Sequence, residues 1–235
     1  MMLKAVLFDF NGIIINDEAL HEQLLEQLLI EENLRPQRAE FQEVCLGRSD
    51  RACLRDLLER RGRVVTDAYL DILIRRKAQA YRQALDGLET LPIYPGLEDF
   101  LFKLQGQGVP MGVVSGALRS EIELVLTRSH LAKYFTVMVG GDEISASKPD
   151  PEGYLLAVDR LNAALPDLQL QPQNCLAIED TYPGIRAAKG AGMQVLGVAN
   201  THPFQMMHRT ANWVVDYLTE VDLEHVRRVF SANAA

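Results

Sequence analysis

The fold is decided close to the amino terminus by residues 4–12, KAVLFDFNG. An unbroken apolar run that ends abruptly at Asp9 is typical of a short strand buried on both faces of a sheet. Asp9 would then lie at the carboxyl end of this strand, which is where open α/β sheets place their ligands. Gly12 follows and allows the backbone to turn tightly beside a ligand. Considered alone, the stretch fits equally well a buried strand followed by a polar turn without function.

The composition limits the class of protein. The chain has 235 residues, of which 48% are hydrophobic and 24% charged, enough for one sizeable core and an inserted subdomain. The formal net charge of −8 argues against a large nucleic-acid-binding surface. The amino terminus has no signal-peptide pattern, and Asp9 interrupts the apolar run, so we expect no membrane span. A cytoplasmic protein, either a monomer or a weak homodimer, is the expectation.

The cysteines suggest no bridge and no metal site. Cys45, Cys53 and Cys175 are scattered along the chain, odd in number and without metal-ligand spacing. We interpret them as small buried side chains of a protein in a reducing compartment.

The spacing of apolar residues changes twice along the chain. Residues 17–90 show helical spacing and no strand-like alternation. After residue 90, helices alternate with apolar runs that we predict to be strands, at residues 109–114, 135–139, 175–178, 194–198 and 213–215. Such alternation predicts a parallel sheet with helices on both faces. We therefore predict an α/β core made of residues 1–16 and 91–235, and an all-helical subdomain made of residues 17–90.

Reactive side chains follow several of the predicted strands. Asp9, Ser115 and the Glu179-Asp180 pair would meet at one edge of the sheet, and Lys148 lies in a loop that could reach them. A carboxylate can attack phosphorus and so split a difficult hydrolysis into two easier steps. A lysine and Mg²⁺ would offset the charge of the phosphoryl oxygens. Taken singly, each residue also fits an ordinary role, such as a surface lysine or a capping serine.

The motifs resemble, in type and in order, those of the haloacid dehalogenase superfamily. They are Asp9–Gly12, Val113–Gly116, Ser147–Pro151 and Ile178–Thr181. The helical insertion after the first motif is similar to the small cap of the branch that contains β-phosphoglucomutase and phosphoglycolate phosphatase. The resemblance covers nearly the whole chain. It implies a Rossmann-like core with a helical cap. It also implies that the protein acts on a small phosphorylated metabolite with the help of Mg²⁺.

The resemblance also implies roles for the residues of the core. Asp9 matches the aspartate that becomes phosphorylated and that also binds Mg²⁺. Lys148 matches the lysine that neutralises nucleophile and phosphate. Ser115, followed by Gly116, matches the hydroxyl that binds the phosphate.

The remaining matches concern the metal and the cap. Asp180 matches the acidic metal ligand, and Glu179 beside it would be a ligand or lie just behind the ligands. The position of Asn11 supplies a backbone carbonyl to the metal, which asparagine retains. His21 and Arg48 match, more loosely, substrate-binding positions of the cap.

Asn11 departs from the family pattern. Phosphotransferases of the superfamily have a second aspartate there as general acid/base, and an amide cannot relay a proton at neutral pH. An inactivating substitution, a naturally slow or catalytically silent phosphate-binding protein, and a different reaction of the superfamily all stay open. We rank a phosphatase first and a β-phosphoglucomutase-type mutase second. Phosphonate cleavage would need a Schiff-base lysine in the cap, but we expect Lys77 on an exposed helical face.

Overall fold

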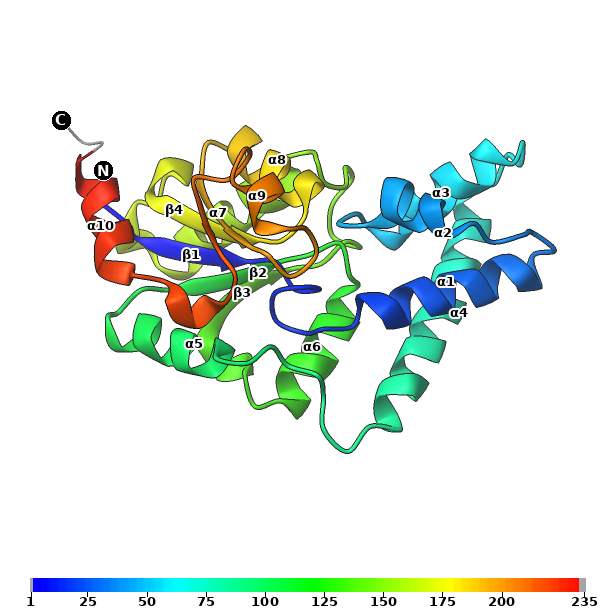
Figure 1. Cartoon of the computed structure of the whole chain (residues 1–235), viewed down its shortest axis with the longest axis horizontal. Helices are drawn as coiled ribbons and strands as arrows, with labels where there is room; N and C mark the ends of the chain where they lie inside the picture. Colours follow the sequence, from blue (N-terminus) through cyan, green and yellow to red (C-terminus); the bar gives the residue numbers. More distant parts are fainter. Residues whose placement is uncertain (1, 233–235) are drawn as a thin grey trace.

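The computed structural model describes residues 2–232, which form an α/β core with a group of helices beside it (Figure 1). Within these residues, the core contains a six-stranded sheet with strand order β3-β2-β1-β4-β5-β6, and each neighbouring pair is parallel. The strands are β1 Ala5–Phe8, β2 Met111–Val114, β3 Phe135–Val139, β4 Cys175–Glu179, β5 Gln194–Val198 and β6 Trp213–Val215. The predicted α/β class with a parallel sheet is confirmed.

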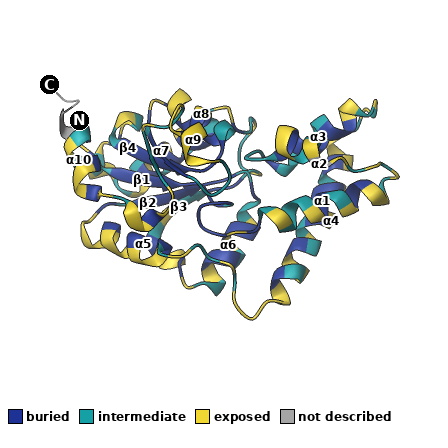
Figure 2. Cartoon of the chain, viewed as in Figure 1, coloured by how far each residue is buried: buried dark blue, intermediate teal, exposed yellow. Residues whose placement is uncertain are grey.

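Helices cover both faces of the sheet, because the central strands are apolar on both sides. Every residue of β1, β2 and β4 is buried. One face packs against α5 (Leu97–Gly106), α6 (Arg119–Arg128) and α10 (Leu223–Ala232), and the other against α7 (Glu152–Ala164), α8 (Tyr182–Gly190) and α9 (Phe204–Met207). Figure 2 shows the resulting layers, with the sheet buried and the outer sides of the helices exposed. Because all neighbouring strands are parallel, their carboxyl ends lie together at one edge of the sheet.

The helices of residues 17–90, here called the helical insert, have an apolar cluster of their own. They are α1 (Glu18–Glu31), α2 (Arg38–Glu40), a π-helical turn (Phe41–Cys45), α3 (Asp50–Arg60) and α4 (Asp67–Asp86). Leucines of α1, α3 and α4 supply most of this cluster. The helical character of the insert agrees with the sequence pattern, while the proposed division into two domains stays a prediction.

The insert joins the core through two segments that lie side by side. Asn16 N donates a hydrogen bond to Pro92 O (2.8 Å), and Tyr94 N donates one to Ile14 O (3.1 Å). Because the two crossings are paired, the insert is held over the carboxyl edge of the sheet by a short double connection.

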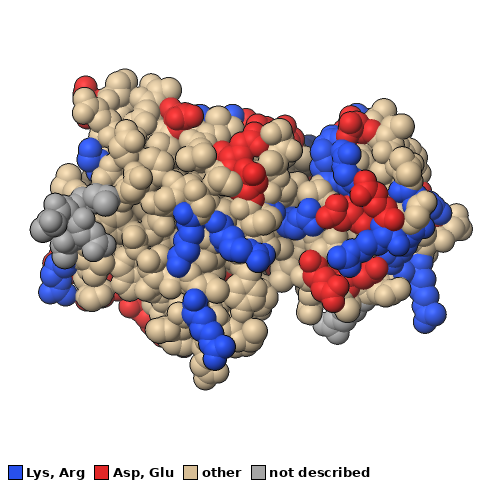
Figure 3. Space-filling view, turned by 90° about the horizontal axis from the view of Figure 1, so that it is seen from above, with Lys and Arg blue, Asp and Glu red and all other residues tan. Residues whose placement is uncertain are grey.

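Charged side chains gather on the surface of the insert, where they form ion pairs. Arg51 pairs with Asp67 and Asp71, and Arg61 pairs with Glu40. Figure 3 shows positive and negative side chains next to one another on this part of the molecule, so neither sign forms a continuous patch on the face in view.

None of the helices within residues 2–232 has the length and apolar character that crossing a membrane requires.

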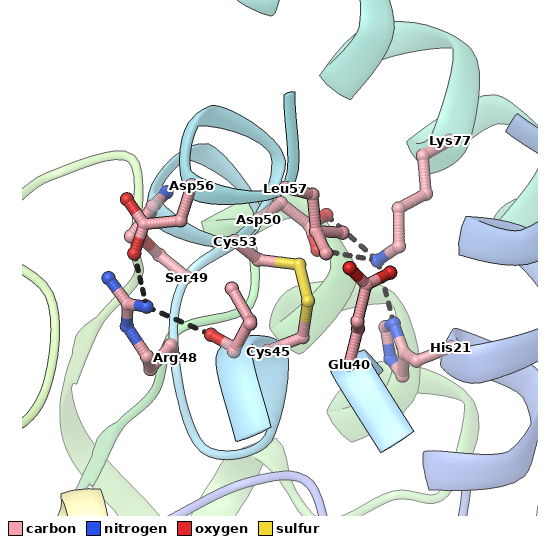
Figure 4. The surroundings of a disulfide bond; sticks show 12 residues. His21, Glu40, Cys45, Arg48, Ser49, Asp50, Cys53, Asp56, Leu57 and Lys77 are labelled. Atoms are coloured by element: carbon pink, nitrogen blue, oxygen red, sulfur yellow. Dashed lines mark hydrogen bonds and ion pairs between the residues drawn. A yellow bond between two sulfur atoms is a disulfide. The ribbon is translucent and has the colours of Figure 1, made fainter. Parts of the chain in front are cut away.

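All three cysteines are buried, as expected, but two of them are not free thiols. Cys45 ends the π-helical turn, Cys53 lies in α3, and a disulfide joins them with Cα atoms 4.6 Å apart (Figure 4). The pairing depends on the turn made by residues 46–52, which the spacing of cysteines in the sequence does not reveal. Cys175 is a buried free thiol, as expected. The cysteines therefore no longer support a reducing compartment, and the cytoplasmic location stays a prediction.

Candidate active site

Asp9 follows β1 directly and lies at the carboxyl edge of the sheet. Asp9 N donates a hydrogen bond to Ile178 O (2.9 Å), which ties this residue to β4. Its Oδ1 accepts a hydrogen bond from Phe10 N (2.8 Å). Gly12 has φ +78°, and a Cβ atom there would lie 2.0 Å from Asp180 Oδ2. The turn after β1 thus requires glycine, because the carboxylate of Asp180 occupies the space of a side chain.

Lys148 is buried between two carboxylates. Its Nζ lies 2.8 Å from Asp9 Oδ1 and 2.7 Å from Glu179 Oε1, and it donates a third hydrogen bond to Val114 O (3.1 Å). Burial alone would lower the pKa of Lys148, but the carboxylates of Asp9 and Glu179 raise it above its usual value. The lysine therefore stays charged beside the residue that the sequence predicts to be the nucleophile.

Three buried carboxyl groups meet next to this lysine. Asp9, Glu179 and Asp180 each have an oxygen within 4.8 Å of the others. Burial, together with Glu179, raises the pKa of Asp9 to about 7 against the opposing effect of Lys148, and burial also raises the pKa of Asp180. Asp180 Oδ1 is buried without a hydrogen-bond partner among the described residues. This oxygen-rich cluster, which Lys148 compensates only in part, suits a hard divalent cation such as Mg²⁺.

Glu179 is held by Lys148 and Thr181, and also by Tyr154, which the sequence did not single out. Its Oε1 accepts hydrogen bonds from Lys148 and from Tyr154 OH (2.6 Å), and its Oε2 accepts one from Thr181 Oγ1 (3.3 Å). A Cβ atom on Gly184 would lie 2.0 Å from the carboxylate. Glu179 thus positions Lys148. Tyr154 lies on the apolar stripe of α7, where nothing in the sequence distinguishes it from a packing residue.

Ser115 and Gly116 continue β2 onto the same edge. Ser115 N donates a hydrogen bond to Val139 O (3.0 Å), and Ser115 Oγ accepts one from Ala117 N (3.0 Å). A Cβ atom on Gly116 would lie 2.7 Å from Arg48 O. The glycine therefore permits the insert to approach the core closely at this point.

Asn11 faces the insert. Its Nδ2 donates a hydrogen bond to Asp17 Oδ1 (3.0 Å), and Tyr81 OH donates one to Asp17 Oδ2 (2.5 Å). Burial would raise the pKa of Asp17, but His21, Asn11 and Tyr81 together lower it. Asp17 is the residue before α1, but within the described residues its side chain makes no capping hydrogen bond. It instead accepts hydrogen bonds from the side chains that surround Asn11.

The expectation that Lys77 lies on an exposed helical face was wrong. Lys77 is 3% exposed, with its Nζ 2.7 and 2.8 Å from the oxygens of Asp50 and 2.8 Å from His21 Nδ1. The carboxylate of Asp50 raises the pKa of Lys77 against the effect of burial, so the ammonium donates and Nδ1 accepts. The other ring nitrogen of His21, Nε2, lies 3.3 Å from Asp17 Oδ2 and 3.1 Å from Asn11 Nδ2.

A signal for Lys77 was present in the sequence. Leu70, Ile74, Tyr81 and Leu85 lie at helical spacing along α4, and all are buried. Lys77 occupies a position within this stripe, and a lysine there needs a buried partner.

Arg48, predicted to bind substrate, points away from Lys77 in Figure 4. Its Nη1 donates hydrogen bonds to Val44 O (2.9 Å) and Asp56 Oδ2 (2.7 Å). The neighbouring Ser49 N donates one to Ser147 Oγ (2.7 Å), which fastens residues 46–52 to the loop that carries Lys148. Residues 46–52, here called the wall, therefore lie between the insert and the core.

A cavity brings most of the predicted residues together. Core and insert both contribute to its lining, through Asp9, Asn11, Gly116, His21, Arg48 and Lys77. Four predicted residues are not part of that lining but lie next to it on the core side: Ser115, Lys148, Glu179 and Asp180.

Comparisons with known proteins agree with this arrangement. Residues 6–198 match the family of haloacid dehalogenase-like hydrolases. Validoxylamine A 7′-phosphate phosphatase from Streptomyces hygroscopicus subsp. limoneus is 28% identical over 226 residues, which are 96% of this chain and 99% of the relative. β-Phosphoglucomutase from Bacillus subtilis (strain 168) is 30% identical over 207 residues, 86% of this chain and 85% of the relative.

A solved structure shares the whole fold. The crystal structure of β-phosphoglucomutase from Clostridium difficile superimposes with a TM-score of 0.85 at 22% identity and covers 99% of both chains. The resemblance inferred from the sequence motifs is confirmed. The chain belongs to the haloacid dehalogenase-like hydrolase family and is related to β-phosphoglucomutase and phosphoglycolate phosphatase.

Proposed function

We propose that this protein is a phosphatase that hydrolyses the phosphate monoester of a small hydroxylated metabolite, such as a sugar phosphate, with Asp9 as nucleophile. The observation that carries the proposal is the buried contact of Asp9 with Lys148 beside two further carboxylates. The Streptomyces relative, which matches along its whole length, is named as a phosphatase of a phosphorylated small molecule. This name supports the same reaction class here.

In the first step, Asp9 attacks phosphorus. Its Oδ1 is engaged by Lys148 and Phe10 N, so we assign the attack to Oδ2. The Oδ2–P bond forms while the ester O–P bond breaks, which gives an aspartyl-phosphate and leaves a departing oxygen that needs a proton. Lys148 offsets charge on the phosphoryl group, and Ser115 is suited to donate a hydrogen bond to it.

In the second step, water attacks the phosphorus of the aspartyl-phosphate. The Oδ2–P bond breaks, inorganic phosphate leaves, and Asp9 returns as a carboxylate. This step requires a base for the attacking water, just as the first requires an acid for the leaving oxygen.

Mg²⁺ is the cofactor that we propose. Asp9 and Asp180 would hold it together with the backbone carbonyl of Asn11, and Glu179 would lie beside these ligands. Asp180 Oδ1, which has no hydrogen-bond partner within residues 2–232, supports this assignment. When bound, the ion would offset the negative charge of the phosphoryl oxygens.

Asn11 makes slow turnover part of the proposal. Its amide donates to Asp17 and has no titratable proton to give to a leaving group. Loss of a general acid/base lowers rates by on the order of 10²–10⁴-fold. We therefore expect slow hydrolysis of alkyl phosphates.

A mutase is the second candidate, favoured by the 30% identity to the Bacillus β-phosphoglucomutase. It would return the phosphoryl group to the sugar, so the products of a hexose 1-phosphate distinguish the two. A catalytically silent phosphate-binding protein is the third, favoured by Asn11.

The test is a screen of phosphate release over a panel of metabolite phosphates with Mg²⁺, using the chain with Asn11 and the Asn11→Asp variant. Release of inorganic phosphate supports the phosphatase, and a rearranged sugar phosphate supports the mutase. If neither protein turns over any phosphate but both bind one, the silent protein is favoured.

A further inference from the structure

The charge at the insert end of the cavity restricts the substrate class. Asp9 and Gly116 line the core end, while Glu18, Asp50 and Lys77 line the insert end. A substrate with its phosphate at Asp9 must place the rest of its structure toward the insert. The groups there therefore decide which phosphate esters bind, provided that the proposed function holds.

Lys77 has its charge and its donors used within the protein. Its ammonium contacts both oxygens of Asp50 and the Nδ1 of His21, at 2.7 to 2.8 Å. An ammonium has three protons, so these contacts exhaust its donors. A second phosphate on the substrate would have to displace Asp50 to reach this lysine.

Arg48, the other cation of the cavity lining, is also paired. Its Nη1 forms an ion pair with Asp56 at 2.7 Å and donates to Val44 O. Figure 4 shows this pair on the opposite side of the disulfide from Lys77 and Asp50. The two cations are thus held apart by separate acidic partners and do not form one clamp for an anion.

Further carboxyl groups surround the insert end. Glu18 lines the cavity, and Glu121 of α6 lies close enough to interact electrostatically with Asp50 and Lys77. Glu121 is 3% exposed, and its Oε1 has no hydrogen-bond partner within the described part of the chain. The carboxyl groups of Glu18, Asp50 and Glu121 therefore lie around Lys77, and burial raises the pKa of Glu18 and of Glu121.

From these contacts we infer that the site selects monophosphates whose remaining part is a hydroxyl-rich group without a second anion, and that Asp50 is the residue that disfavours bisphosphates. Hydroxyl groups can donate to Glu18 and Asp50, and a positively charged amine is tolerated for the same reason. A second phosphate meets like charge in a partly buried site, where repulsion is costly. The inference rests on the proposed phosphatase function and deepens it by naming the substrate class.

The test compares kcat/KM for glucose 6-phosphate, glucosamine 6-phosphate and glucose 1,6-bisphosphate with Mg²⁺, in the natural chain and in Asp50→Asn. We expect the bisphosphate to be at least about tenfold poorer than either monophosphate in the natural chain. Asp50→Asn, which keeps an oxygen to accept from Lys77, should narrow this ratio by about tenfold. Asp71→Asn removes a carboxylate from an exposed ion pair of the same insert and should leave the ratio unchanged.

The ratio of kcat/KM values is independent of the fraction of folded enzyme, so partial unfolding of a variant does not blur the result. A bisphosphate that is hydrolysed as well as the monophosphates, or an unchanged ratio in Asp50→Asn, would overturn the inference. If no ester is hydrolysed, the proposed function fails on its own. Calorimetric Kd values for the same three ligands then provide the comparison, with the same expected ratio and the same overturning result.

Discussion

The two ends of the cavity balance their charges in opposite ways. At the core end, Lys148 contacts Asp9 and Glu179, two of three buried carboxyl groups, and the third, Asp180, keeps an oxygen without a hydrogen-bond partner among the described residues. At the insert end, Lys77 is closed off by Asp50 and His21. The first arrangement suits a phosphoryl group together with a divalent cation, because the three donors of Lys148 are engaged as well and the carboxyl groups there outnumber it. The second suits a neutral group, because its own cation is already satisfied.

Removal of divalent cations tests the core end most severely. We expect complete loss of phosphatase activity in excess chelator, because Asp9 and Asp180 would repel the phosphate that they face. Activity should return on addition of Mg²⁺. Full turnover in chelator, in a preparation shown by elemental analysis to be free of metal, would contradict the proposed site.

Replacement of Lys148 should have the next largest effect. Lys148→Ala removes the charge beside Asp9 and should lower kcat by on the order of 10³-fold, since such groups act on charge that develops in the transition state. Lys133→Ala, at a side chain 59% exposed, is the matched control and should behave as the natural chain. Circular dichroism checks that both variants are folded. Normal turnover by folded Lys148→Ala would reduce this lysine to a structural ion-pair partner.

Asn11→Asp supplies the proton relay that the present sequence lacks. We expect kcat for alkyl phosphates to rise by on the order of 10²-fold, because an alkoxide leaving group needs a proton. Nitrophenyl phosphate has an acidic leaving group and should gain much less. Equal, small gains on both substrates would mean that another residue acts as acid and base.

The core end could be predicted from the sequence because its parts are local. Asp9, Ser115 and Asp180 each follow an apolar run, and a parallel sheet brings the ends of such runs to one edge. Lys148 was found through its motif, and its contact with Asp9 agrees with the expectation. What local pattern could not supply was the support from Tyr154, whose hydroxyl reaches Glu179 from 25 residues away.

The insert end was predicted poorly because its interactions join distant segments. Lys77 meets Asp50 across 27 residues and His21 across 56. Burial of a charge depends on such partners, and helical spacing alone indicates only that the position faces inward. The same limit explains the disulfide, since its two cysteines meet through the turn of residues 46–52. Fold class thus follows from the pattern, whereas specificity depends on packing between helices.

The smallest expected effect concerns this disulfide, which restrains residues 46–52 at the insert end of the cavity. Cys45 and Cys53 enclose the segment whose Ser49 N donates to Ser147 of the core. The two cysteines have a sequence separation of 8. In the chain-entropy account, closing such a loop raises the free energy of the unfolded chain by about 2–3 kcal/mol and so stabilises the fold. Reduction should therefore lower the midpoint of thermal unfolding and reduce kcat/KM by about two- to fivefold as the segment loosens.

Two controls isolate this effect. Cys53→Ser should respond to reductant in neither assay, whereas Cys175→Ser should respond like the natural chain, because Cys175 takes no part in the bridge. Thiol titration of the denatured, unreduced natural chain should give one free thiol. A titration that gives three would show that the bridge is absent in solution. The wall of the insert end would then depend on Ser49 and its neighbours alone, and reductant should leave kcat/KM unchanged.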